Sequence, residues 1–220
     1  MRRGCDHGKQ GLRCLPVEEK RIPAGKRLMV DWERKLRIRT EGENFHVADG
    51  ENFPYEPTPY SVLERLAKSG YLKRENTLVD YGCGKGRASF MLAHLTRCRV
   101  IGIDYNEELI RKANENKLSS GMSGITFEHV RAEEYEINGA DSFFFFNPFS
   151  DRILKKVIDQ ILWSWYEDPR KMRLFFYYPT DEDVALLMTT EELMFTDEID
   201  CSDLFDETNK RERILIFETA

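Results

Sequence analysis

The feature that most constrains this chain is a glycine-rich loop between an apolar run and a helix-like stretch. Residues 77–90 read Thr-Leu-Val-Asp-Tyr-Gly-Cys-Gly-Lys-Gly-Arg-Ala-Ser-Phe. The apolar run at Leu78 and Val79 predicts the end of a buried strand, and the residues from Ala88 onward predict the first turns of a helix. A strand, a glycine loop and a helix in this order bring backbone close to a ligand at a helix N-terminus. The sequence therefore predicts an α/β fold with a ligand at this loop.

The charge at the mouth of the loop argues against a nucleotide diphosphate. Asp80 lies two residues before the first glycine, and two like charges about 4 Å apart repel by roughly 4 kcal/mol at an effective dielectric near 20. The spacing also differs from the dinucleotide pattern G-x-G-x-x-G, because the third glycine, Gly86, comes one residue early. The loop is therefore predicted to bind a cationic ligand with an ammonium or sulfonium group.

A second apolar run ends in an acid. The run Val100–Asp104 places Asp104 24 residues after Asp80. An acid at the tip of the second strand can accept hydrogen bonds from both ribose hydroxyls of an adenosine, and Tyr105 is expected to lie against the adenine. An adenosine with a cationic amino-acid tail describes S-adenosylmethionine.

Both segments, 80–86 and 101–105, resemble the first two motifs of the class I S-adenosylmethionine-dependent methyltransferases. The resemblance extends from about Pro57 to the C-terminus and implies a doubly wound, seven-stranded, mostly parallel sheet, the Rossmann-like methyltransferase fold. It implies the cofactor and methyl transfer, but not the acceptor. The implied cofactor contacts are Asp80, Tyr81, Gly82, Gly84, Gly86, Asp104, Tyr105, Glu133 and Asn147.

Roles follow from the resemblance for three of these residues. Asp80 is expected to hold the ammonium group, directly or through water, and Asp104 the ribose. Glu133 follows a predicted strand over residues 125–130 and is expected to accept from the adenine amine. Glu134 is an alternative for that role, and an exposed loop is the alternative interpretation for both glutamates.

Two further segments are predicted to line the acceptor side. Four phenylalanines at 143–146 predict a central strand that is covered on both faces, and Asn147-Pro148-Phe149 follows at its carboxyl end, where α/β folds place ligands. These three residues resemble a motif of methyltransferases that act on planar nitrogen, although one proline is missing. Asn147 and Phe149 are therefore predicted to orient the acceptor; a simple turn is the alternative. Tyr55, in a proline-stiffened lead-in, is the third predicted catalytic residue, with a rigid connector as the alternative.

Local signals predict several other elements. Ser61, with Glu64 three residues later, is expected to cap a helix, and Asn106 is expected to cap another that ends near Gly121. An apolar stripe predicts a core helix after Ser150. The remaining predicted strands are Leu174–Tyr178, Phe195–Asp200 and Arg213–Glu218, with one of them antiparallel.

Charge is distributed unevenly along the chain. Residues 1–40 have a net charge of +7. Because the whole chain has a net charge of −6, the other 180 residues have a net charge of −13. We interpret residues 1–50 as a basic N-terminal arm or small cap, with short strands from residue 28 to 47, and residues 51–220 as the methyltransferase domain. A basic arm on an acidic body is consistent with an RNA contact, a solvated face or an arm packed on the body.

Composition and cysteine usage indicate in which compartment the protein is expected. A charged content of 33%, and the absence of an apolar run near the roughly 18 residues of a membrane span, predict a soluble protein. The basic N-terminus lacks the apolar region of a signal peptide. Five scattered cysteines favour reduced thiols and a cytoplasmic location. The spacing of Cys5, His7 and Cys14 matches no common zinc pattern, so no metal is expected.

The sequence does not identify the acceptor of the methyl group. The lead-in and Asn147-Pro148-Phe149 loosely resemble methyltransferases of protein lysines that lack a SET domain, and a small molecule is a comparable alternative. An RNA acceptor would account for the basic arm. A protein that binds the cofactor without transferring methyl is the alternative from another class. No general base is evident, and solvent or a tyrosine hydroxyl would have to take the proton.

Overall fold

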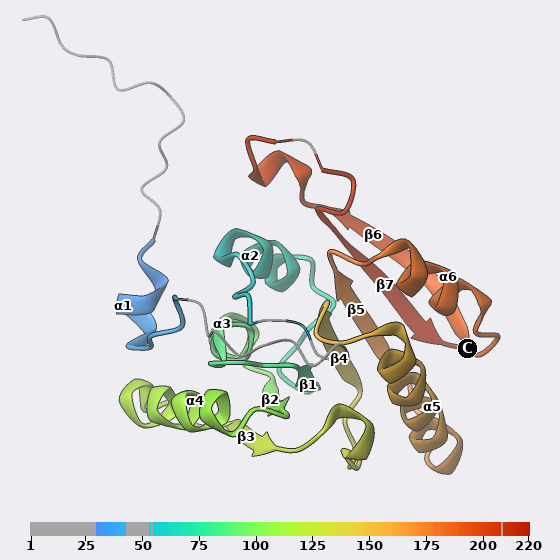
Figure 1. Cartoon of the computed structure of the whole chain (residues 1–220), viewed down its shortest axis with the longest axis horizontal. Coiled ribbons are helices and arrows are strands. Elements are labelled where there is room, and N and C mark those ends of the chain that lie inside the picture. The colour runs from blue at the N-terminus through green and yellow to red at the C-terminus, as the bar shows by residue number, and fades with distance from the viewer. Residues whose placement is uncertain (1–29, 43–52, 54, 208) are drawn as a thin grey trace, which may run out of the picture. The chain divides into compact units, whose positions relative to one another are not determined.

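The strands in the described part of the chain form one seven-stranded sheet in the order β3-β2-β1-β4-β5-β7-β6 (Figure 1). The computed structural model describes residues 30–42, 53, 55–207 and 209–220, and residues 31–220 form one compact unit. The strands are β1 (Thr77–Tyr81), β2 (Arg99–Asp104), β3 (Ile125–His129), β4 (Ser142–Phe146), β5 (Arg173–Tyr177), β6 (Leu193–Asp200) and β7 (Arg213–Thr219). The helices are α1 (Trp32–Leu36), α2 (Tyr60–Lys68), α3 (Arg87–Thr96), α4 (Glu107–Ser120), α5 (Asp151–Glu167) and α6 (Asp181–Thr189), with short 3-10 turns η1 (Ala132–Glu134) and η2 (Ser202–Leu204).

The sheet is parallel except for one strand. Strand β7 runs antiparallel to both β5 and β6, while β1 pairs in parallel with β2 and β4. This confirms the predicted doubly wound, mostly parallel sheet with one antiparallel strand. The strand order reverses between β1 and β4, and α/β sheets place their ligands outside the carboxyl ends of the strands at this point. The glycine loop after β1 and Asn147 after β4 flank that position.

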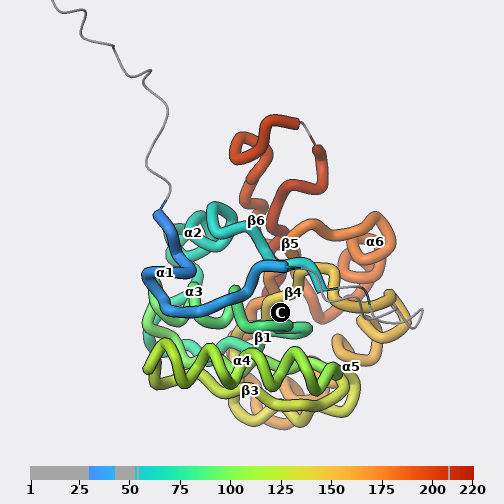
Figure 2. The backbone as a smooth tube through the Cα atoms, turned by 60° about the vertical axis from the view of Figure 1, so that its left-hand side comes forward, coloured from blue at the N-terminus to red at the C-terminus, as the bar shows by residue number. Residues whose placement is uncertain are grey.

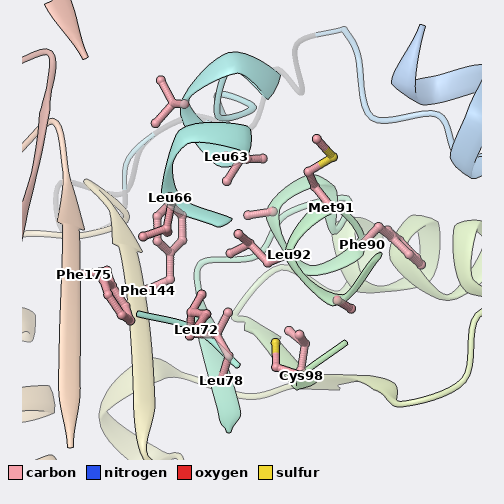
Figure 3. Close-up of a cluster of buried hydrophobic side chains, with 14 of the residues drawn as sticks. Leu63, Leu66, Leu72, Leu78, Phe90, Met91, Leu92, Cys98, Phe144 and Phe175 are labelled. Carbon is pink, nitrogen blue, oxygen red and sulfur yellow. The ribbon is translucent and has the colours of Figure 1, made fainter. Parts of the chain in front are cut away.

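Helices cover both faces of the sheet. One core cluster joins α2 and α3 to alternate residues of β1, β4 and β5, such as Leu78, Phe144 and Phe175 (Figure 3). The other joins α5 to the opposite faces of the same strands, including Val79 and Phe145. Because β4 is covered on both sides, the first three of its four phenylalanines are fully buried, as the unbroken apolar run predicted.

Several local predictions are confirmed. The Asn106 side chain caps α4 by accepting from the Leu109 N–H at 3.1 Å, and Gly121 ends that helix in a left-handed conformation. Ser150 occupies the N-cap of α5. The apolar stripe of α5 is buried as the core helix predicted.

Two predictions need correction, and one helix was not predicted. Residues 32–36 form α1 rather than a strand, because the Asp31 carboxylate accepts from the Arg34 N–H at 3.0 Å and caps the turn. Helix α2 begins at Tyr60 with Pro59 at its N-cap, so Ser61 lies inside the first turn and forms no capping box. Helix α6 was not predicted, although Thr180 and Asp183 form a capping box at its start.

Other predictions fall outside the described residues. These include the expected irregular structure of residues 1–27 and the absence of a metal site at Cys5, His7 and Cys14. Among the helices that the structure describes, none has both the length and the apolar composition of a membrane span.

Candidate cofactor and acceptor site

The glycine loop joins the end of β1 to the start of α3 in a tight turn. The N–H groups of Gly82 and Cys83 both donate to the Ile103 carbonyl of β2 at 2.9 Å, and the Gly86 N–H donates back to the Cys83 carbonyl at 2.8 Å. The glycines at 82, 84 and 86 all have positive φ, with 88° at Gly86, the N-cap of α3. Only glycine adopts this conformation without strain, which explains why the sequence spaces glycines two residues apart here.

Asp80 lies beneath the loop. Its side chain is only 3% exposed and accepts a hydrogen bond from the Ser89 hydroxyl of α3 at 2.5 Å. Burial raises the pKa of Asp80 to about 6, and the Ser89 hydrogen bonds partly offset that effect. Asp80 is therefore a buried carboxylate directly behind the turn, held by one helix residue.

Asp104 ends β2 next to the loop. Its Oδ2 accepts from the Gly84 N–H and its Oδ1 from the Asn106 N–H, each at 2.9 Å, and the side chain is 7% exposed. Burial raises the pKa of Asp104, while these two backbone donors lower it. Each carboxylate oxygen can accept more than one hydrogen bond, so both retain capacity for the two hydroxyls of a ribose.

The two cations of the loop region are bound to protein. The Lys85 ammonium donates to the Glu41 and Gly42 carbonyls at 2.8 and 2.7 Å. The Arg87 guanidinium donates to the Thr40 hydroxyl at 2.7 Å. Lys85 keeps its positive charge, but both cations direct their donors at protein oxygens, and Arg87 also lies 3.4 Å from the Glu33 carboxylate. Behind the loop lie two buried carboxylates, and close to these a positively charged ligand is favoured over a diphosphate.

Two residues from other parts of the chain pack against the loop. A β-carbon added at Gly84 would overlap the Tyr55 ring, and one added at Gly82 would lie 2.5 Å from the Pro148 Cβ. The Pro148 carbonyl also accepts from the Phe53 N–H at 3.3 Å. The structure thus brings the predicted lead-in and the predicted acceptor segment together at the glycine loop.

The predicted adenine residues lie beyond β2 and β3. Tyr105 is half-buried, and its carbonyl contacts the His129 Nε2 at 2.9 Å. Glu133 lies in η1, where its carbonyl accepts from the Gln160 side chain of α5 and its carboxylate lies 3.9 Å from the Arg131 guanidinium. Tyr81 points to the opposite face of β1 from Asp80, with its ring stacked on Phe145 at 4.9 Å. Adenine binding by Tyr105 and Glu133, and a cofactor contact of Tyr81, stay predictions.

Asn147 and Phe149 line one small cavity at the ends of β4 and β5, together with Tyr177 and Asp183. Phe149 is buried and packs edge-on against Tyr81 and Phe145. Asn147 is a non-glycine residue with a positive φ of 42°. Residues held in this region cost free energy and concentrate at functional sites.

Sequence reasoning missed a second left-handed residue beside Asn147. Strands β4 and β5 pair Phe146 with Tyr177, so the residues that follow them, Asn147 and Tyr178, end neighbouring strands at the same level. Tyr178 has a φ of 56°, its hydroxyl accepts from the Asn209 amide at 2.6 Å, and the Arg211 guanidinium lies 4.2 Å from its ring centroid. No local signal in the sequence marks Tyr178, because its position beside Asn147 depends on the pairing of β4 with β5.

Sequence reasoning also missed the residues that bind the two cations of the loop region. These are Glu33 and Thr40, which contact Arg87, and the Glu41 and Gly42 carbonyls, which accept from Lys85. One signal was available. Arg87 is a cation at the first position of α3, where the helix dipole disfavours positive charge, so it required an acceptor from elsewhere in the chain.

Residues 72–162 match a protein family described as a methyltransferase domain. The protein-lysine N-methyltransferase of Saccharolobus islandicus is 32% identical over 72 residues, which cover 32% of this chain and 45% of that relative. The ribosomal protein L11 methyltransferase of Aquifex aeolicus is 33% identical over 82 residues, or 37% of this chain and 31% of that relative. The matches therefore span less than half the length of either relative.

The fold is similar to that of the Pyrococcus abyssi tRNA (uracil-54, C5)-methyltransferase, solved in complex with S-adenosyl-L-homocysteine. The TM-score is 0.50 and the identity 16%, over 72% of this chain and 37% of that chain. The buried carboxylates, the three glycines and the occupied loop cations fit a cationic adenosine cofactor, S-adenosylmethionine. Together with the match of residues 72–162 to a methyltransferase domain and with the fold, they support a class I S-adenosylmethionine-dependent methyltransferase.

Proposed function

We propose that this chain transfers the methyl group of S-adenosylmethionine to a side-chain amine of a protein. The observation that carries the proposal is the charge of the loop: Asp80 and Asp104 are buried beside it, while Lys85 and Arg87 are bound to protein oxygens. When bound, the cofactor supplies an electrophilic methyl group on a positively charged sulfur. The contribution of the protein is binding and alignment.

The chain's own residues divide this work. Asp104 holds the ribose hydroxyls with the lone pairs that Gly84 and Asn106 leave unused. Ionised Asp80 stabilises the ammonium group of the cofactor. Asn147 orients the acceptor nitrogen, because its amide can both donate and accept hydrogen bonds. The amine must reach the site without its proton, which solvent can remove before transfer.

The acceptor side favours a lysine over a neutral metabolite. Phe146 and Tyr178 form an aromatic corner with ring centroids 6.5 Å apart. The Arg211 guanidinium already lies over the Tyr178 ring. The groups that would attract a cation are therefore the Phe146 ring and the Glu212 carboxylate, which accepts from the Tyr177 hydroxyl at 2.6 Å. Aromatic faces and acidic groups attract an alkylammonium side chain. The −13 charge of residues 41–220 adds long-range attraction for basic protein segments. The relative from Saccharolobus islandicus, named a protein-lysine N-methyltransferase, supports the same choice.

RNA is a second candidate acceptor, and one observation favours it. In residues 31–40, Trp32, Leu36, Ile38 and Thr40 are buried, whereas the exposed positions include Arg34, Lys35, Arg37 and Arg39. Such a basic face beside the loop suits a phosphate backbone. The acidic body opposes it, so we rank RNA below protein.

Methyl transfer from tritiated S-adenosylmethionine to cell lysate tests these alternatives. Label that protease removes and nuclease spares is expected for a protein acceptor. Label lost with nuclease would replace our proposal with RNA, and label among small molecules would replace it with a metabolite. Tight cofactor binding without any labelled product would instead indicate a protein that only binds the cofactor. The Asp104→Asn variant is the negative control.

We expect cofactor affinity to rise about tenfold between pH 5 and pH 7, because a cation binds the ionised form of Asp80, whose pKa lies at about 6 in the free protein. The ammonium group of the cofactor stays protonated over this range, so the change reports on the protein. In Asp80→Asn the affinity should change less with pH over the same range, because this carboxylate no longer titrates. Calorimetric titration of both proteins measures this, and a wild-type protein with constant affinity would exclude contact between Asp80 and the ammonium group.

A further inference from the structure

A segment that precedes the methyltransferase motifs is built onto the glycine loop. We call residues 31–42 the N-terminal strap. Trp32, Leu36 and Ile38 insert into the core cluster that contains α2 and α3, and the Trp32 indole N–H donates to the Glu64 carboxylate at 2.8 Å. Figure 2 shows the strap in blue, running from α1 past α3. The strap is therefore part of the folded unit and ends beside the loop.

The loop region holds the strap through buried charge. Arg87 donates to the Thr40 hydroxyl at 2.7 Å and lies 3.4 Å from the Glu33 carboxylate. The Thr40 N–H and hydroxyl both donate to that carboxylate. Thr40 is fully buried. Breaking this network would leave a charged group inside the protein without its partner, which is costly.

Asn116 of α4 fixes the same junction from the other side. Its carbonyl oxygen accepts from the Arg39 N–H at 2.8 Å, and its amide nitrogen donates to the carbonyls of Arg39 and Lys85 at 3.1 and 3.0 Å. One buried side chain thus joins the strap to the glycine loop. Both of its N–H donors and its carbonyl oxygen bond to backbone groups, which indicates a fixed position.

The strap in turn holds Tyr55. The Tyr55 hydroxyl donates to the Thr40 carbonyl at 2.7 Å, and its ring covers Gly84 so closely that a β-carbon there would overlap it. Burial raises the pKa of Tyr55, so the hydroxyl stays protonated and committed to Thr40. Tyr55 is therefore unsuited to proton transfer and well placed as a wall of the site.

We infer that the N-terminal strap, through Glu33, Thr40 and Arg87, holds Tyr55 against Gly84 and thereby sets the affinity of the glycine loop for S-adenosylmethionine. This makes Thr40 and Arg87 positioning residues, and Tyr55 a wall residue rather than the catalytic group suggested by the sequence. The inference rests on the proposed use of the loop for this cofactor. The inference means that cofactor affinity depends on the N-terminal strap as well as on the glycine loop.

Calorimetric titration with S-adenosylmethionine tests the inference on three variants. Thr40→Val keeps the shape but removes the hydroxyl, and should weaken binding about tenfold. Thr40→Ser restores the hydroxyl and should bind within about twofold of wild type. Arg111→Gln removes an exposed arginine that pairs with Glu108 and Glu115 on α4, and serves as the matched control with unchanged affinity. Circular dichroism confirms that each variant is folded at the titration temperature.

A second measurement separates failure of the inference from failure of the proposed function. Hydrogen exchange of the amides at residues 82–86 should be faster in Thr40→Val than in wild type, with or without cofactor, because the strap no longer holds the loop. If wild type binds no S-adenosylmethionine but Thr40→Val still exchanges faster than wild type, the proposed function and the inferred effect on affinity are both wrong. Only the contact by which the strap holds the loop would then remain. Folded Thr40→Val with wild-type affinity, or Tyr55→Ala with tighter binding, would overturn the inference alone.

Discussion

Asp104→Asn should weaken S-adenosylmethionine binding roughly a hundredfold, equivalent to about 3 kcal/mol. Both oxygens of Asp104 already accept from backbone N–H groups, those of Gly84 and Asn106. An asparagine amide would direct its NH₂ group at one of these donors, so the substitution removes a ribose acceptor and also places one backbone N–H opposite another donor. Loss of the charged acceptor acts on the bound state, whereas the mismatch with a backbone donor is already present in the free protein and disturbs the loop that the cofactor must bind.

Isothermal titration of the purified variant measures this effect. Glu107→Gln is the matched control, because Glu107 is an exposed acid in the first turn of α4, three residues after Asp104. The control should bind as wild type does. If Asp104→Asn retains its affinity within about twofold, the assignment of the ribose to the end of β2 is wrong, since even one lost hydrogen bond should exceed that change.

Gly84→Ala should lower the free energy of unfolding by about 2–5 kcal/mol and abolish measurable cofactor binding. The left-handed conformation of residue 84, with φ of 54°, costs an alanine about 1–2 kcal/mol. The added methyl group also overlaps the Tyr55 ring, and forced overlap in a packed region typically costs a further 1–3 kcal/mol or so. Displacing Tyr55 removes the wall from the site.

Urea unfolding of three variants separates the two costs. Gly121→Ala introduces the same left-handed strain, with φ of 64°, where a β-carbon meets nothing within 4 Å. It should cost only about 1–2 kcal/mol. In a Tyr55→Ala background, Gly84→Ala should cost no more than Gly121→Ala does. If Gly84→Ala in the wild-type background is no worse than Gly121→Ala, Tyr55 does not pack on the loop.

Much of the site followed from short-range sequence signals. Three glycines at spacing two, with Asp80 before them, specify a tight turn of left-handed residues and its charge. Asp104 was found because an acid ends an apolar run, and strand ends in parallel sheets meet at one edge. The run of phenylalanines predicted a buried central strand, because alternation would have exposed two of them. These inferences held because each depends on neighbours in the chain.

Other features depend on contacts that the sequence does not encode locally. The alternation over residues 36–39 suggested a strand, and the burial does alternate there. Yet the segment pairs with no strand of the described sheet, because its partners are the side chains of Arg87 and Asn116. Tyr178 gained its place beside Asn147 only when β4 and β5 paired in register.

By itself the sequence determined the class of fold, the position of the glycine loop and the sign of the charge beneath it. These depend on backbone conformation and burial, which residue type and spacing largely dictate. Only the tertiary structure decided that Lys85 and Arg87 serve the strap and that Tyr55 covers Gly84. Arg87 and Thr40 are 47 residues apart in the chain, and no local preference specifies which distant acceptor a buried cation will meet.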